Sequence, residues 1–203
     1  MKFLYTALGR FDKTCEGDEL PSHLGHFQNN WSWGKYIEWS RLHHLTDLVS
    51  LDCALNEDLV EVSYGENSED WNFIAFPEEG QHLTGFYTSL DYVLKRPRVL
   101  AKGRYNLLTV VIEPDQECRD IIVDGFEFVG YELLDQAFSI SVLTNCGGYD
   151  DVFLPMDLND KGLIDDFSKA RDIQKRLSEK HSDCWHAENA RVIAVWRHTT
   201  IGR

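Results

Sequence analysis

Residues 141–151, "SVLTNCGGYDD", place a cysteine between a strand-like run and two glycines, with two acids directly behind them. A thiol at the end of a strand, beside backbone N–H groups, has the surroundings of a nucleophile next to an oxyanion-binding site. The structural alternative is a positive-φ turn at Gly147 and Gly148, with Cys146 filling a small apolar space before it. Residues 136–149 carry no charged side chain, which favours the structural alternative.

A catalytic Cys146 would need a base, and the histidines nearest to it in the sequence are His181 and His186. An acid would in turn orient the imidazole, and the candidates are Asp150 and Asp151. Cys146, His186 and Asp150 therefore form the predicted catalytic set if the protein is an enzyme. Proximity in the sequence does not establish proximity in the fold.

A second spacing concerns metal binding. His43 and Asp47 are four residues apart on a predicted helix, and His23 and His26 precede them in a loop. No recognised metalloprotein motif contains these residues, so a solvated helix face is the preferred interpretation. We therefore predict no metal site and no cofactor.

The helical projection of residues 39–55 places Arg41, His44 and Asp52 within the apolar stripe of that helix. Arg41 and Asp52 would lie about 16 Å apart along the axis, so they cannot pair with each other. Each side chain therefore needs a partner from the sheet, or a cleft, and Arg41 and His44 become candidate binding residues.

Residues 95–104, "KRPRVLAKGR", contain five positive side chains and no acid. Arg96 and Arg98 are the candidate anion-binding residues of this segment. No Gly-rich strand-to-helix loop accompanies them, so we expect the segment to pair with neighbouring carboxylates rather than to bind phosphate.

The chain has 203 residues, with 20 Lys and Arg against 34 Asp and Glu and a formal charge of −14. Such a charge repels nucleic acid and attracts a basic protein partner. The five cysteines are odd in number and form no Cys-x-x-Cys pair, which indicates reduced thiols. With no membrane-length apolar run and no leader-like start, we expect a cytoplasmic protein without membrane contact.

The secondary-structure patterns predict one α+β domain over residues 1–203, with an antiparallel or mixed sheet of about five strands and helices on one side. Short turns between neighbouring runs favour an antiparallel meander. The predicted helices cover residues 39–55, 88–96 and 167–180, the last capped by Asp165 or Asp166. The predicted strands cover residues 71–76, 105–113, 126–134, 138–145 and 190–198.

Three C-terminal stretches are similar to a family of small uncharacterised bacterial proteins with no assigned activity: "LTNCGGYDDVF", "LNDKGLIDDFSKARDIQKRL" and "HSDCWHAENARVIAVWRH". The resemblance covers roughly the last 80 residues. It implies a cytosolic bacterial setting, in which some small acidic proteins act as immunity or inhibitor proteins. It implies nothing about catalysis.

Two functions follow from the sequence. The first is a non-enzymatic, immunity- or inhibitor-like protein that binds a basic partner, which the charge and the lack of a specific catalytic motif favour. The alternative is a thiol or acyl-transfer enzyme that uses Cys146.

Overall fold

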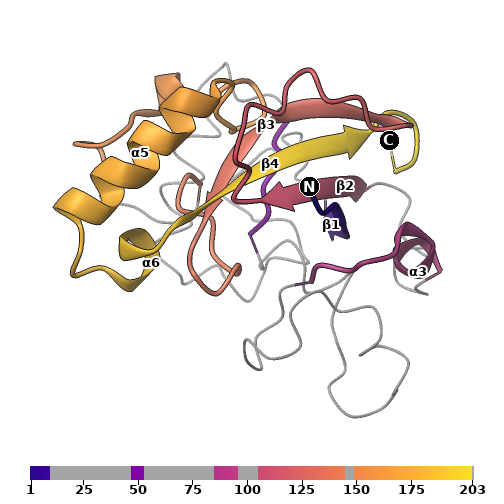
Figure 1. Cartoon of the computed structure of the whole chain (residues 1–203), viewed down its shortest axis with the longest axis horizontal. Coiled ribbons are helices and arrows are strands. Elements are labelled where there is room, and N and C mark those ends of the chain that lie inside the picture. Colours follow the sequence, from indigo (N-terminus) through magenta and orange to yellow (C-terminus); the bar gives the residue numbers. More distant parts are fainter. Residues whose placement is uncertain (10–46, 53–84, 96–104, 145–148, 203) are drawn as a thin grey trace, which may run out of the picture.

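The computed structural model describes residues 1–9, 47–52, 85–95, 105–144 and 149–202, which are coloured in Figure 1. Its elements are β1 (Leu4–Gly9), α3 (Leu90–Leu94), β2 (Tyr105–Ile112), β3 (Phe126–Leu134), the 3-10 turn η3 (Pro155–Asp157), α5 (Phe167–Lys180), α6 (Trp185–Glu188) and β4 (Arg191–His198). The strands form one four-stranded antiparallel sheet in the order β1-β2-β4-β3, which confirms an α+β fold. None of the helices in these ranges combines the length and apolarity needed to cross a bilayer.

The sheet differs from the predicted one in its members. Strands β2, β3 and β4 lie where the β-branched and aromatic runs predicted them. The fourth strand is β1, which the sequence shows only as a short apolar run, whereas residues 138–144 form no strand. The prediction for residues 71–76 lies outside the described residues.

Polar side chains explain why residues 138–144 form no strand. The Asp135 carboxylate accepts hydrogen bonds from the backbone nitrogens of Ser139, at 2.8 Å, and Ile140, at 3.2 Å. The Ser141 hydroxyl accepts one from the nitrogen of Thr144, at 3.1 Å. Backbone N–H groups that bind side chains in this way cannot pair with a neighbouring strand. Only an isolated bridge between Leu134 and Ser141 forms in this segment.

The strand order also overturns the predicted meander. The last strand of the chain, β4, lies between β2 and β3, as Figure 1 shows. Strand β4 has six successive buried residues, as an inner strand covered on both faces does. Strand β3 also has six, but it begins with the exposed Glu127 between two partly covered residues, and this uncovered end fits a place at the edge of the sheet.

The two faces of the sheet carry different coverings. On one face, α5 packs its buried residues Ala170, Ile173 and Leu177 against the sheet. Val93 of the short helix α3 lies on the same face, at the β1 side, in contact with the cluster around Leu107. Figure 1 shows α5 and α3 at opposite ends of the sheet. The opposite face is covered by apolar residues from irregular segments: Val49, Leu51, Phe86, Phe138 and Leu163.

Helix α5 confirms its prediction at both ends. It spans Phe167–Lys180, and the Asp166 carboxylate caps it by accepting a hydrogen bond from the nitrogen of Lys169, at 2.7 Å. Helix α3 is shorter than predicted, because Ser89 caps it and it ends at Leu94.

Residues 47–52 correct the prediction of a helix over residues 39–55, since no helix is present in this part of it. The nitrogens of Asp47 and Val49 donate to the carbonyls of Asp160 and Lys161, at 3.1 and 2.9 Å. Donors at alternate residues are typical of an extended chain. All residues from Leu48 to Asp52 are buried, and such a continuous run fits an extended segment inside the protein as well as a helix.

Candidate functional site

The predicted base His186 lies in α6 and contacts Asp135, which follows directly after β3. The Nδ1 atom of His186 is 3.2 Å from the Asp135 carboxylate. The side chain of Asp135 is 1 % exposed, and that of His186 is 35 % exposed. The acid in contact with His186 is therefore Asp135, which is 51 residues away in the sequence, and the predicted catalytic role of His186 and Asp150 stays a prediction.

Opposing effects act on the pKa of Asp135. Burial raises it, but hydrogen bonds from His186 and from the nitrogens of Ser139 and Ile140 outweigh burial, so the pKa lies below its ordinary value. Asp135 is therefore ionised at neutral pH and fixes the imidazole of His186 through Nδ1. The described part of the chain supplies no hydrogen-bond partner to Nε2 of His186.

The second predicted histidine, His181, has a separate acid partner. Its Nε2 atom is 2.9 Å from the carboxylate of Asp151, and this hydrogen bond is the main reason why the pKa of Asp151 is lowered. The ring of Tyr149 packs edge-on against His181, and its hydroxyl lies 3.0 Å from the sulfur of Cys184. Asp150 is exposed, and Cys146 lies outside the described residues.

A buried polar network joins β3 to segment 47–52, and no sequence motif indicated it. Ser141 donates through its hydroxyl to Glu132, at 3.0 Å, and through its backbone nitrogen to Asp52, at 2.8 Å. Thr144 and Ser50 extend the chain of hydroxyl contacts, at 2.8 and 3.0 Å. Asp52 thus has a buried partner, the backbone nitrogen of Ser141 directly after β3, although no helix with an apolar stripe is present at residues 47–52.

Glu132 has a strongly perturbed pKa. Burial raises its pKa to about 8, despite hydrogen bonds from Ser141 and from the nitrogens of Leu133 and Leu51, and the charge of Asp52 adds to the rise. Glu132 is therefore mainly protonated at neutral pH. The sequence around Glu132 does not indicate a partner for its side chain. The register of β3 in the sheet places Glu132 on the face that segment 47–52 covers, and this placement reveals its buried contacts.

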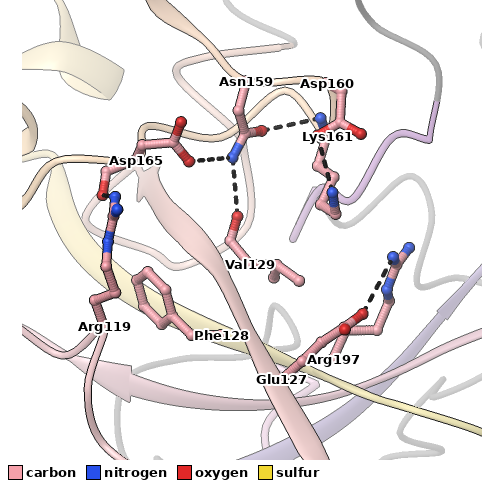
Figure 2. Close-up of a pocket in the computed structure, with 9 residues that line it drawn as sticks. All are labelled: Arg119, Glu127, Phe128, Val129, Asn159, Asp160, Lys161, Asp165 and Arg197. Atoms are coloured by element: carbon pink, nitrogen blue, oxygen red, sulfur yellow. Dashed lines mark hydrogen bonds and ion pairs between the residues drawn. The ribbon is translucent and has the colours of Figure 1, made fainter.

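A pocket of about 550 Å³ lies along the outer edge of β3 (Figure 2). Val129 lies at its centre, with Arg197 and Glu127 on one side and Arg119 and Asp165 on the other. Asn159, Asp160 and Lys161 line the remaining wall. The pocket therefore presents both signs of charge within one hollow.

Asn159 fixes the wall of this pocket to the sheet. Its side-chain nitrogen donates to the carbonyl of Val129, at 2.9 Å, and to the Asp165 carboxylate, at 2.8 Å. Gly130 allows the close approach of this wall, since a Cβ atom there would lie 2.7 Å from Cβ of Leu163. The wall is thus held by two hydrogen bonds from one amide nitrogen.

Arg197 of β4 is the buried cation of the pocket. Its side chain is 6 % exposed, and Nη1 lies 2.7 Å from Asp47, whereas Nη2 lies 3.6 Å from Glu127. Its Nε atom is buried and finds no acceptor among the residues that the structure describes. A guanidinium has five N–H donors, so this one is short of hydrogen bonds.

The predicted binding residues Arg41, His44, Arg96 and Arg98 lie outside the described residues, as does His43 of the considered metal pair. Asp47 of that pair binds Arg197 instead. In the described ranges, no three His, Cys, Asp or Glu side chains are arranged to hold a metal ion.

Comparison of the chain with protein-family models, with curated proteins and with solved structures found no match. The function must therefore be argued from the surfaces and sites of the chain itself.

Proposed function

We propose that the protein is a non-enzymatic binding module, of the immunity or inhibitor kind, for a basic protein partner. The observation that carries the proposal is the acidic loop, residues 113–125, which joins β2 to β3. It contains five acids and one cation, Arg119, and Ile122 within it is 95 % exposed. The exposed acids are Asp115, Glu117, Asp120 and Asp124.

The acidic loop is held to the core at two residues that precede Ile122, Cys118 and Ile121. Cys118 is buried, and its backbone nitrogen donates to the Tyr131 hydroxyl, at 2.8 Å. The indole nitrogen of Trp196 donates to the carbonyl of Ile121, at 3.2 Å. A loop fixed in this way presents Ile122 without a large loss of conformational entropy on binding.

The charges and the isoleucine would have different roles. Acids around a contact speed the approach of a basic partner and lose this effect as salt rises. Burying the Ile122 side chain in an apolar pocket of the partner would contribute roughly 1.5–3 kcal/mol to affinity. Salt sensitivity and dependence on Ile122 should therefore occur together.

The test is a pull-down from native lysate at low and high salt, with the protein and its Ile122→Ser variant as baits. Met156→Ser, at a side chain that is 75 % exposed elsewhere, is the matched control. We expect a basic protein that high salt releases, that the Met156 variant retains and that the Ile122 variant loses. A salt-sensitive protein retained equally by both variants, or none at all, contradicts the proposal.

A second candidate function, a cysteine-dependent thiol or acyl-transfer enzyme, is favoured by one observation. The buried, ionised Asp135 orients His186 through Nδ1, as the acid of a nucleophile–base–acid set does. In this candidate Cys146 is the nucleophile, His186 the base and Asp135 the orienting group.

Iodoacetamide labelling of Cys146 against pH tests the second candidate. An activated thiol reacts near neutral pH faster than an ordinary thiol with a pKa of about 8.5, and His186→Ala should remove this excess. His181→Ala is the control. Labelling of Cys146 at the ordinary rate, unchanged in both variants, would exclude this function.

A further inference from the structure

The charges that line the pocket along the edge of β3 are already matched (Figure 2). Nζ of Lys161 lies 2.8 Å from the carboxylate of Asp160, and Nη1 of Arg197 lies 2.7 Å from that of Asp47, which does not line the pocket. The nine lining residues contain three cations and three acids, so their formal charges cancel. A charged ligand would have to compete with one of these pairs, and an anion would also meet the −14 charge of the chain. An uncharged ligand avoids both costs.

The hydrogen-bonding groups of the lining are not matched in the same way. Arg197, whose side chain is 6 % exposed, has no acceptor for Nε among the described residues, and its Nη2 atom lies 3.6 Å from Glu127, beyond hydrogen-bond range. Asp160 and Asp165 each accept a side-chain hydrogen bond through Oδ1, whereas Oδ2 of either accepts none within the described part of the chain. The pocket therefore has donors without acceptors, beside carboxylates that can accept further hydrogen bonds.

A hydroxyl group meets both conditions, because it accepts through its oxygen and donates through its hydrogen without carrying a charge. One hydroxyl can accept from Arg197, and another can donate to Oδ2 of Asp160. The ring of Phe128 also lines the pocket, and edge-on contacts with Tyr131 and Trp196, at centroid distances of 5.1 and 5.4 Å, hold this ring in place. Phe128 offers an apolar surface to the C–H groups of a ligand that carries several hydroxyls.

We propose that this pocket binds one uncharged sugar unit. Its volume of about 550 Å³ lies within the range of small-molecule sites, about 300–1,000 Å³, and exceeds what one ion or one water molecule needs. Arg197 and Arg119, which lie on opposite sides of the pocket in Figure 2, donate to hydroxyl oxygens of the sugar. Asp160 accepts from a hydroxyl, and the C–H face of the sugar ring packs on Phe128. This binding does not depend on the proposed contact with a basic partner.

The probes are three neutral sugars, the methyl glycosides of glucose, galactose and mannose. Each is titrated into the isotope-labelled full-length protein and followed by amide chemical shifts. The 2-amino sugar and the uronate of the same stereochemistry, which carry one positive and one negative charge, are the matched comparisons. We expect at least one neutral sugar to give saturable shifts at Val129, Asn159 and Lys161, with a dissociation constant of about 1–10 mM. Both of its charged counterparts should bind at least about threefold more weakly.

Variants locate the binding. Arg197→Lys keeps a cation beside Asp47 but removes Nε and the planar guanidinium donors, and it should weaken the neutral sugar at least about fivefold. Arg119→Ala and Asp160→Ala, both at exposed positions, should each weaken it at least about threefold. Asp172→Ala, at an exposed acid of α5, is the control and should leave the affinity unchanged. The two exposed variants decide the question if Arg197→Lys fails to fold.

Three results would overturn the proposal. The first is no shift at the pocket with any of the three neutral sugars up to about 50 mM. The second is an amino sugar or a uronate that binds more tightly than its neutral counterpart, which would mean that charge governs the site. The third is equal weakening by Asp172→Ala and by the pocket variants, which would place the binding elsewhere.

Discussion

Replacing Glu132 with Gln should destabilise this protein at acidic pH and stabilise it at alkaline pH. Glu132 is fully buried in β3, and its pKa is raised from 4.5 to about 8. An acid with a raised pKa stabilises the fold in its protonated form. Its contribution is complete below its unfolded-state pKa near 4.5 and is lost as pH rises through about 8.

The magnitude follows from the two pKa values. The gap between 4.5 and about 8 corresponds to about 5 kcal/mol, at about 1.4 kcal/mol for each tenfold change in proton affinity. At pH 7 about 3 kcal/mol of this is already lost. Gln cannot ionise, so the variant avoids the loss, although its amide nitrogen no longer accepts from the nitrogen of Leu51, at 3.4 Å.

Urea unfolding of both proteins from pH 5 to pH 9, followed by tryptophan fluorescence, measures the difference. We expect the variant to be about 1 kcal/mol less stable at pH 5 and more stable by several kcal/mol at pH 9, with the sign changing in between. Glu127→Gln, at an exposed position of the same strand, is the control and should give a difference that stays within about 1 kcal/mol.

Other titrating groups act equally in both proteins and cancel in the difference. A difference between the protein and its Glu132→Gln variant that is constant from pH 5 to pH 9 would therefore refute the reasoning. It would mean that Glu132 titrates as it does in the unfolded chain.

Three further predictions are measured by the same unfolding experiment. Asp166→Ala removes the cap of α5 and should cost about 1 kcal/mol, whereas Asp172→Ala, at an exposed position of α5, should change stability by less than about 0.5 kcal/mol. Gly130→Ala should cost about 1–3 kcal/mol, because Gly130 has a φ of 139° and a new Cβ atom would lie 2.7 Å from Leu163. Asp135→Asn should destabilise at neutral pH and lose this effect below about pH 3.8, since the pKa of Asp135 is lowered from that value.

Local patterns predicted those elements whose own residues decide their structure. Helix α5 has an apolar face at helical spacing and an acid where its cap must lie, and both appear as predicted. Strands β2 and β4 are runs rich in β-branched and aromatic residues and also appear as predicted. In these segments the local preference and the tertiary contacts agree.

The predictions of secondary structure failed in segments whose conformation depends on contacts with distant parts of the chain. Segment 47–52 has a pattern that suits a helix, but the carbonyls of residues 160–161 and the carboxylate of Glu132 bind its nitrogens in an extended form. Residues 138–144 have strand-like composition, but Asp135 and Ser141 take their backbone donors. The groups that bind these backbone nitrogens cannot be identified from the sequence, because it does not show which segments lie next to each other in the fold.

The candidate sites show the same difference between features that depend on local residues and features that depend on distant contacts. The sequence offered His186 and His181 as possible bases, because histidine is recognisable by type, and Asp150 and Asp151 as acids. In the structure His181 contacts Asp151, whereas His186 contacts Asp135, which is 51 residues away in the sequence. The pocket beside β3 depends on β4 lying next to β3, so the strand order had to be known before Arg197 and Glu127 could be placed together.

The carboxylates with shifted pKa values also determine the pH at which the protein should be most stable. Asp135 and Asp157 have lowered pKa values, so their contributions are lost as pH falls below about 3.8. Glu132 acts in the opposite direction, and its contribution is lost as pH rises above about 4.5. The excess of acids over bases adds repulsion as pH rises above the isoelectric point, near 4.9. The maximum should therefore lie near pH 4–5 and move to higher pH in Glu132→Gln, and a maximum at the same pH in both proteins would contradict this balance.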